Sequence, residues 1–415
     1  MKKITVTAVS LLLLCSFCLN FVGCTSIKAQ DLMENVHSNR VEKISDLSQN
    51  SATLTDFALR LFNESMASGD KNSSIAPLSV LCALAMVANG ADGNTREQLE
   101  NTLGMSVDAL NVYLYSYVNS LPQGEKYKLE LANSIWFTDD QRFTVNQDFL
   151  QTNADYHDAD VYKAPFNKST LNDINRWVKD ETDGMIDKIL DEIPPEAVMY
   201  LVNTLAFEAE WTEIYERYQV KDGTFTTENG EEQNAKFMFS TEGSYLEDEN
   251  ATGFIKYYKE RKYAFVALLP NENVSIADYV ASLNGEKLNK MLSEPTVATV
   301  YTSIPKFESE YSIEMSDVLK TMGLTDAFDP HTADFTKLGS SSDGNIFINR
   351  VLHKTYISVA EKGTKAGAVT VIEIGCGSAE PSEPKYVYLD RPFVYMLIDT
   401  ETNIPFFIGT QMSLK

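Results

Sequence analysis

The segment that most limits the possible folds of this chain covers residues 364–376. Starting with its first residue, every second side chain is uncharged, and the two charged ones, Lys365 and Glu373, stand at the alternate positions. Because side chains along a strand alternate between two faces, this pattern predicts a strand that can bury one face. Gly363 precedes the segment and a run rich in serine and proline follows it at 377–384, which is typical of a protruding loop. The segment is therefore either an ordinary hairpin strand with a long turn or a loop that can become a strand.

The rest of the chain mixes helical and strand patterns without a regular alternation between them. Apolar spacing and start signals predict helices at 55–66, 75–89, 94–99 and 171–179. Runs rich in β-branched and aromatic residues predict strands at 129–137, 199–207, 262–269, 298–307, 346–359 and 391–398. No internal repeat is present, so the sequence indicates an α+β protein with substantial sheet.

The first 24 residues predict an export signal. Lys2 and Lys3 precede the apolar run at 4–22, and Gly23 and Cys24 follow, which is the charged, apolar, small order of such segments. A glycine directly before a cysteine also resembles the lipobox of bacterial lipoproteins, which implies a lipid on Cys24. A simple secretory signal and an uncleaved anchor are the alternatives. We therefore expect an extracellular protein that is attached to the bacterial surface by its N-terminal lipid, or else secreted.

Residues 25–50 are polar and lack sustained periodicity, so they are expected to form a flexible tether before a domain at 51–415. The chain has 35 lysines and arginines against 59 aspartates and glutamates, a formal net charge of −24. A field of this sign repels phosphate backbones and anionic membranes. We expect no nucleic-acid partner, and membrane contact only through the lipid.

Searches for catalytic and metal-binding motifs find none. None of the four histidines has a second ligand at metal-binding helical spacing, and residues 339–344 miss the nucleophile motif of hydrolases by one position. Residues 375–377 lack the third glycine of a dinucleotide fingerprint. Cys82 lies in an apolar helix-like run and is expected in the core. We expect neither an enzyme nor a cofactor.

The chain resembles the serpin family over nearly all of residues 51–415. The stretches that carry the resemblance are NSSIAPLS at 72–79, GADGNT at 90–95, ANSIWF at 132–137, INRWV at 174–178, TDGMI at 182–186, LVNTLAF at 201–207, IPKF at 304–307, GLTDAF at 323–328 and DRPF at 390–393. The resemblance implies a serpin fold with three β-sheets, about nine α-helices and an exposed reactive-centre loop near the C-terminus.

For the loop, the resemblance implies a suicide inhibitor of serine proteases. A protease attacks the loop as a substrate, and the cleaved loop enters the main sheet as a new strand before the acyl-enzyme is hydrolysed. The implied hinge residues are Glu361, Gly363, Thr364, Ala366, Gly367 and Ala368. Lys362 and Lys365 stand where the family often has Glu. Since Lys365 is on the outward register, we expect little effect on insertion.

The resemblance also assigns two groups beneath the sheet. Ser79, Asn203 and His353 match the shutter, whose hydrogen bonds join strands that part during insertion. Trp211 matches the aromatic residue of the breach, where insertion begins. Ala76 replaces a serine that is common before Pro77, which is expected to remove one hydrogen bond near the shutter.

Family spacing places the reactive bond fourteen residues after Gly363, between Gly377 and Ser378. The bonds Cys376–Gly377 and Ala379–Glu380 remain alternatives. In each case a small residue precedes the cut.

The residues that set specificity are expected to be Ile374, Gly375 and Cys376, which suits elastase-like or subtilisin-like targets. Cysteine proteases fit less well, and trypsin-like ones are disfavoured because no basic residue lies between Lys365 and Lys385. We expect a monomer. A non-inhibitory serpin that acts as a surface binding module is the alternative function.

Overall fold

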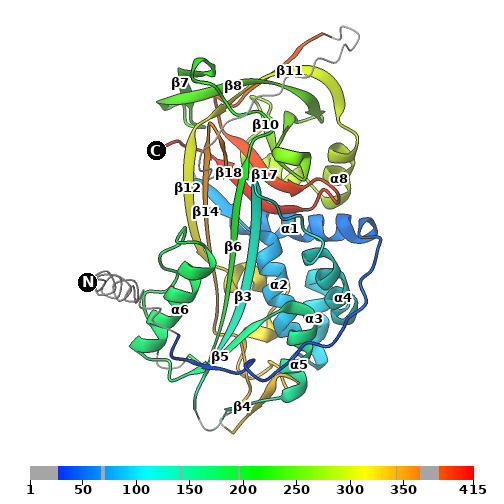
Figure 1. Cartoon of the computed structure of the whole chain (residues 1–415), viewed down its shortest axis with the longest axis vertical. Coiled ribbons are helices and arrows are strands. Elements are labelled where there is room, and N and C mark those ends of the chain that lie inside the picture. Colours follow the sequence, from blue (N-terminus) through cyan, green and yellow to red (C-terminus); the bar gives the residue numbers. More distant parts are fainter. Residues whose placement is uncertain (1–26, 67–70, 141–142, 195–196, 343, 365–382) are drawn as a thin grey trace, which may run out of the picture.

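The computed structural model of the protein describes residues 27–66, 71–140, 143–194, 197–342, 344–364 and 383–415. Its main sheet has seven strands in the order β1-β5-β3-β6-β15-β14-β12 and forms the long vertical layer of Figure 1. These strands are β1 (Gln30–Asp31), β5 (Asp160–Ala164), β3 (Tyr127–Thr138), β6 (Met199–Glu210), β15 (Gly363–Thr364), β14 (Arg350–Ala360) and β12 (Phe307–Glu314). Strand β6 lies in the middle of the sheet and is buried along almost its whole length.

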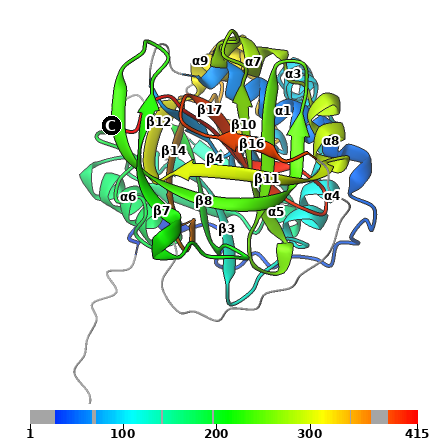
Figure 2. The same cartoon turned by 90° about the horizontal axis from the view of Figure 1, so that it is seen from above.

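A second sheet covers one end of the molecule, with its strands β7, β8 and β11 at the top in Figure 1, and β8 and β11 cross the front of the view from above in Figure 2. Its order is β16 (Lys385–Tyr388), β11 (Thr296–Pro305), β8 (Glu232–Glu247), β9 (Ala251–Tyr257), β10 (Tyr263–Pro270), β17 (Phe393–Asp399), β18 (Pro405–Gln411) and β2 (Ser73–Ile75), with β7 (Val220–Thr226) beside β8. A third sheet pairs β4 (Phe143–Val145) with β13 (Gly339–Ser341).

Nine α-helices surround the sheets in the residues described here. They are α1 (Ser51–Ser65), α2 (Pro77–Ala88), α3 (Gly93–Leu103), α4 (Val107–Val118), α5 (Gln147–His157), α6 (Lys168–Glu181), α7 (Ile276–Ser282), α8 (Gly285–Ser293) and α9 (Ser316–Thr321). Pro77 begins α2, where its missing N–H costs nothing, and all twelve residues of α2 are buried. This helix is therefore apolar on every side and forms the centre of the core behind the main sheet.

The two faces of the main sheet are packed differently. Alternate residues of β3 and β6 join the large core that includes α2, while the intervening residues Trp136 and Tyr200 pack with Trp177 of α6 in a smaller cluster. This follows from the two-residue period of a strand. In Figure 1, α6 lies on the opposite side of the sheet from α1 to α5.

The predicted helices and strands are mostly present, with ends that differ by a few residues. The predicted strand at 199–207 extends to Glu210, and the predicted helix at 75–89 is α2. The longest strand, β8, was not predicted, because its sixteen residues are polar at most exposed positions. None of the helices among the described residues is long and apolar enough to cross a membrane.

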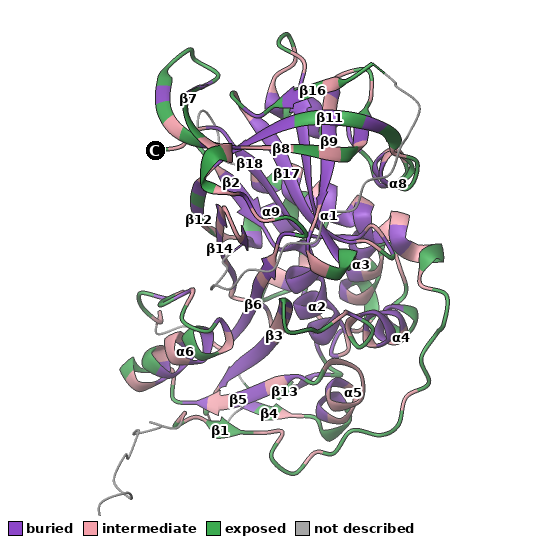
Figure 3. Ribbon diagram, turned by 45° about the horizontal axis from the view of Figure 1, so that its top comes forward, coloured by how far each residue is buried: buried purple, intermediate pink, exposed green. Residues whose placement is uncertain are grey.

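The N-terminal segment, which we define as residues 27–50, differs from the flexible tether that was expected. Its strand β1 pairs with β5, and the amide of Asn39 donates to the Asp155 carboxylate of α5 at 2.6 Å. The segment runs along the outside of the body in Figure 3. The partners of Gln30 and Asn39 are more than one hundred residues away in the sequence, so local composition could not reveal these contacts. The tether prediction is therefore corrected for these residues.

Candidate functional site

Strands β6 and β14 lie side by side at the centre of the main sheet but pair only at one end. Their parallel pairing in the described structure covers Tyr200–Val202 and Arg350–Leu352. At the other end, the two residues of β15 lie between them and pair with both, Gly363 with Glu210 and Ala360, and Thr364 with Ala209 and Val359. The two residues of β15 thus lie as a short strand between β6 and β14 at this end of the sheet.

The two described hinge residues of β15 fit this position closely. A Cβ atom on Gly363 would lie 1.9 Å from the carbonyl oxygen of Ala209, so only glycine allows this approach of the two backbones. The Thr364 side chain is 2% exposed, and its Oγ1 lies 2.5 Å from the hydroxyl of Tyr258. Position 364 therefore carries a buried, uncharged side chain, as the alternation in the sequence indicated.

Glu361 lies at the turn that precedes β15 and forms an ion pair with Lys306 at 2.8 Å. Burial alone would raise the pKa of the Glu361 carboxyl, but the hydrogen bond from Lys306, a backbone hydrogen bond and the positive charge of Lys306 together outweigh it, and the pKa is lowered. The carboxylate is consequently charged at neutral pH and ties the turn to the segment that joins β11 to β12.

The three shutter residues, which come from three distant parts of the chain, meet beneath the sheet. Ser79 Oγ donates to Asn203 Oδ1 at 2.9 Å, and His353 Nδ1 lies 3.0 Å from the same oxygen. The backbone N–H of Ala76 donates to His353 Nε2 at 3.0 Å, so Nε2 carries no proton and Nδ1 is the donor. This contact uses the backbone and does not depend on a serine side chain at position 76.

The imidazole of His353 is neutral. Burial lowers its pKa to about 3, because no carboxylate compensates for the loss of hydration. A neutral ring can donate through Nδ1 and accept through Nε2 at the same time, which both of its contacts require. The histidine therefore connects β14 to β6 and to the start of α2 without introducing a buried charge.

Trp211, the expected breach residue, is fully buried and lies directly against the hinge. Its ring stacks on Tyr258 with centroids 4.4 Å apart and planes 10° apart. Its indole N–H donates to the carbonyl oxygen of Ala360 at 2.9 Å. Sequence reasoning identified the tryptophan but missed Tyr258, whose hydroxyl reaches Thr364.

Two charged residues near Trp211 were also missed. Lys256 of β9 and Glu242 of β8 form an ion pair at 2.8 Å with side chains only 3% and 13% exposed. The sequence offered one signal for this ion pair, the single lysine in β9. A lysine side chain that is buried in a core needs a partner of opposite charge.

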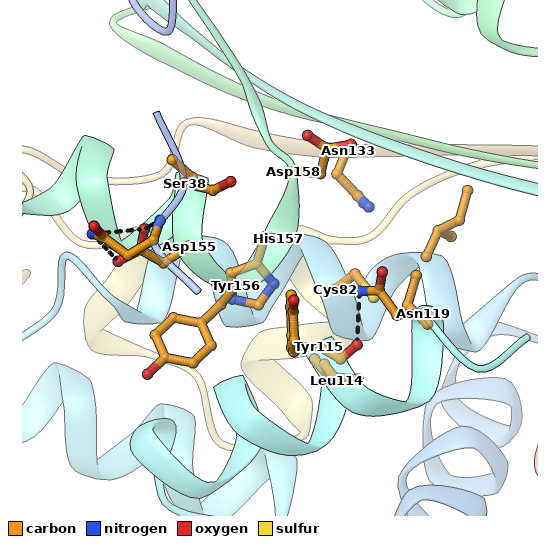
Figure 4. Close-up of a pocket in the computed structure, with 14 residues that line it drawn as sticks. Ser38, Cys82, Leu114, Tyr115, Asn119, Asn133, Asp155, Tyr156, His157 and Asp158 are labelled. Atoms are coloured by element: carbon orange, nitrogen blue, oxygen red, sulfur yellow. Dashed lines mark hydrogen bonds between the residues drawn. The ribbon is translucent and has the colours of Figure 1, made fainter. Parts of the chain in front are cut away.

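A cavity of about 330 Å³ lies on the helix side of β3, and its lining residues are drawn in Figure 4. Asn133 of β3 borders it and faces Asn203 across the sheet, and the Asn133 Oδ1 atom is buried without a hydrogen-bond partner. Burial raises the pKa of the Cys82 thiol to about 12 and lowers that of His157 to about 4. At neutral pH the Cys82 thiol is therefore protonated and unreactive, and His157 is a neutral imidazole.

The remaining sequence-predicted positions lie outside the described residues. They are the lipid site Cys24, the hinge residues Ala366, Gly367 and Ala368, the specificity residues Ile374, Gly375 and Cys376, and the reactive-bond candidates Gly377, Ser378, Ala379 and Glu380.

Comparison with known proteins identifies this arrangement. A family model described as "Serpin (serine protease inhibitor)" matches residues 52–414. The chain belongs to the serpin family. The expected serpin fold is confirmed, and this serpin is 29% identical to Serpin-ZXA of Oryza sativa subsp. japonica, over 88% of this chain and 97% of that protein. It is 27% identical to an uncharacterized serpin-like protein of Thermococcus kodakarensis, over 87% of this chain and 85% of that protein.

Solved serpin structures are similar over almost the whole length. The native state of tengpin, a thermophilic serpin, has a TM-score of 0.88 and 48% identity to this serpin, covering 93% of this chain and 100% of tengpin. The latent state of tengpin has a TM-score of 0.80, covering 90% of this chain and 100% of that one. This serpin is therefore more similar to the native state than to the latent state.

Proposed function

We propose that this serpin inhibits serine proteases as a suicide substrate, by inserting its cleaved reactive-centre loop between β6 and β14. The observation that carries the proposal is the position of β15. Its two residues already occupy the first step of a strand between β6 and β14 and pair with both. Further residues of the loop would continue the same strand toward the shutter.

The side chains that would follow Thr364 into the sheet suit this role. Thr364 is buried, so residues 366 and 368 of an inserted strand would fall on the same face, and both are alanine. Small uncharged side chains enter a closed sheet without the cost of several kcal/mol that a buried unpaired charge carries. Lys365 of an inserted strand would fall on the other face. The loop therefore combines a substrate for a protease with a sequence that can become a buried strand.

Rapid insertion is needed because it competes with hydrolysis of the acyl-enzyme. Backbone pairing between β6 and β14 ends at Val202 and Leu352, so few backbone hydrogen bonds must break before a strand can enter. The side-chain contact between Asn203 and His353 lies directly beyond that point. This arrangement favours separation of β6 from β14 that begins at the end beside β15 and proceeds toward Asn203 and His353.

The proposed targets are elastase-like or subtilisin-like proteases, and the proposed reactive bond is Gly377–Ser378. Small residues in this region suit small or apolar primary pockets. We further propose that the protein acts as a monomer outside the cell and is attached to the bacterial surface through Cys24 or secreted.

The test uses residues 25–415, incubated with pancreatic elastase and with subtilisin and separated on a denaturing gel. We expect a band at nearly the summed mass, and a released C-terminal peptide whose mass places its first residue at Ser378. A peptide that begins at Gly377 or Glu380 would instead support the neighbouring bonds. Cleavage without a stable complex by every protease in a broad panel would overturn the inhibitory proposal and support a non-inhibitory binding role.

A further inference from the structure

A buried ion pair lies next to the hinge without touching it. Lys256 Nζ is 2.8 Å from Glu242 Oε1, and the lysine side chain is 3% exposed. Glu242 Oε1 also accepts a hydrogen bond from Ser240 Oγ at 2.7 Å. Removing two charges from water is costly, and a well-packed apolar pair of similar size is often as stable. Core stability alone therefore gives no reason for a lysine at this place.

The ammonium group of Lys256 contacts the faces of two aromatic rings. It lies 5.4 Å from the ring centroid of Trp211 and 4.5 Å from that of Tyr215. A cation over an aromatic face is attracted by the ring, and more strongly where water is excluded. Both rings are buried, and the Tyr215 hydroxyl lies 3.2 Å from Ser240 Oγ. Lys256 thus fixes the positions of Trp211 and Tyr215 relative to β8 and β9.

The same two aromatic residues hold the hinge turn, which we define as Ala360–Lys362. Trp211 donates from its backbone N–H to the Lys362 oxygen and from its indole to the Ala360 oxygen, both at 2.9 Å. The backbone N–H of Tyr215 donates to the Glu361 oxygen at 2.9 Å. Every carbonyl of the turn is therefore held by a residue whose ring contacts Lys256.

We infer that Lys256 is a positioning residue for loop insertion. It holds Trp211 and Tyr215, and through them the hinge turn, so that Gly363 and Thr364 stay between β6 and β14 before any protease arrives. After cleavage, insertion then continues from a strand that has already begun. This inference rests on the proposed inhibitory function, and it makes the ion pair a determinant of how often insertion precedes hydrolysis.

The first test compares Lys256→Met with Lys256→Arg in residues 25–415. The measured quantity is the number of serpin molecules consumed per protease molecule trapped. We expect Lys256→Met to raise this stoichiometry by about fivefold, with the rate of loop cleavage unchanged. Lys256→Arg keeps the positive charge and is expected to have the stoichiometry of the parent. Lys385→Met is the matched control, because Lys385 also lies over a ring, that of Tyr245 at 5.0 Å, and its backbone pairs with Val300 of β11 and not with the hinge turn.

A lowered melting temperature with unchanged stoichiometry in Lys256→Met would show a structural role only and would overturn the inference. If that variant does not fold, Tyr215→Leu removes one ring contact and leaves the ion pair, and the same increase is expected. An unchanged stoichiometry in Tyr215→Leu would also count against the inference.

The second test needs no protease. Thr364→Cys is introduced together with Cys376→Ser, and the reaction of residue 364 with a thiol reagent is followed by peptide mass under native conditions. We expect slow labelling because position 364 is buried, and labelling about tenfold faster when Lys256→Met is added. Equal rates in the two backgrounds would overturn the inference. This result is independent of whether any protease is trapped, so failure of the proposed function and failure of the inference are distinguishable.

Discussion

His353 Nδ1 lies 3.0 Å from Asn203 Oδ1, immediately beyond the last backbone pair between β6 and β14, which joins Val202 to Leu352. The imidazole is thus the first bridge between the two strands on the side where they separate. Its Nε2 accepts from Ala76, so the same ring also ties the strands to α2. Opening the sheet past this point requires the Asn203 contact to break.

His353→Ala is expected to destabilise the native protein by about 2–5 kcal/mol. The substitution leaves a cavity, and Asn203 and the backbone N–H of Ala76 each lose a buried hydrogen-bond partner. It should also speed the loss of inhibitory activity during incubation of the uncleaved protein at 37 °C. Urea unfolding and residual trapping over time measure the two effects. His331→Ala is the control, because His331 is exposed. Equal urea midpoints for the two variants would contradict this view of the shutter.

Stability should fall in mild acid through two buried histidines. The pKa of His353 is lowered to about 3 and that of His157 to about 4, both by burial, against 6.5 for the free residue. The unfolded chain therefore binds more protons than the native protein below pH 6.5. The contribution is fully present above pH 6.5 and is lost as the pH falls toward the folded values, at about 1.4 kcal/mol per pH unit for each histidine.

Urea midpoints between pH 7.5 and 5 measure this slope. Carboxylates add to the acid response of the parent, so the informative comparison is with His157→Gln and His353→Gln. Each variant is expected to show a shallower slope than the parent. Parallel slopes would mean that these rings take up protons in the native state as readily as in the unfolded chain, and would contradict their lowered pKa.

Thr364→Arg is expected to convert the inhibitor into a substrate. Position 364 is 2% exposed and faces the hydroxyl of Tyr258, so the variant must either bury an unpaired guanidinium, at a cost of several kcal/mol, or withdraw the hinge from the sheet. The loop should still be cleaved, with at least about tenfold more serpin consumed per protease trapped. Thr364→Ser keeps the hydroxyl and should behave as the parent. Normal trapping by the arginine variant would show that residue 364 does not enter the sheet.

Gly363→Ala tests the close approach of the hinge to β6. The added Cβ would lie 1.9 Å from the Ala209 carbonyl oxygen, so β15 cannot keep its present place. We expect slower insertion, seen as a higher stoichiometry of inhibition. Gly243→Ala is the matched control, since a Cβ there meets nothing within 4 Å. If both variants inhibit equally well, the hinge must tolerate a displaced β15.

Much of the fold was predictable because its central strands and its core helix have simple patterns. Strand β6 is apolar along most of its length, with Asn203 and Thr204 as an interruption, and α2 begins with a proline and is apolar on every face, so both stand out in the sequence. Strand β8 was missed because its exposed half is polar, and although β7 and β9 are its neighbours in the sequence, its pairing with β11 is set by distant residues.

The candidate site was predictable only in part. The shutter residues and Trp211 were assigned by resemblance to the family, while the alternation after Thr364 was visible in the residues themselves. The contacts of Lys256 were not predictable, because the lysine, its carboxylate and the two rings come from three separate segments. The pairing of β1 with β5 was hidden for the same reason.

The pairing of β1 with β5 also determines how the molecule would stand on a cell. Cys24 precedes Gln30 by six residues, which span at most about 20 Å. If Cys24 carries a lipid, the membrane must lie close to the end of the main sheet where β1 is bound. Figure 3 places β16, which follows the reactive-centre loop in the chain, at the opposite end. The protein would then stand upright on the surface, with β16 at the end far from the membrane and directed toward the surrounding medium.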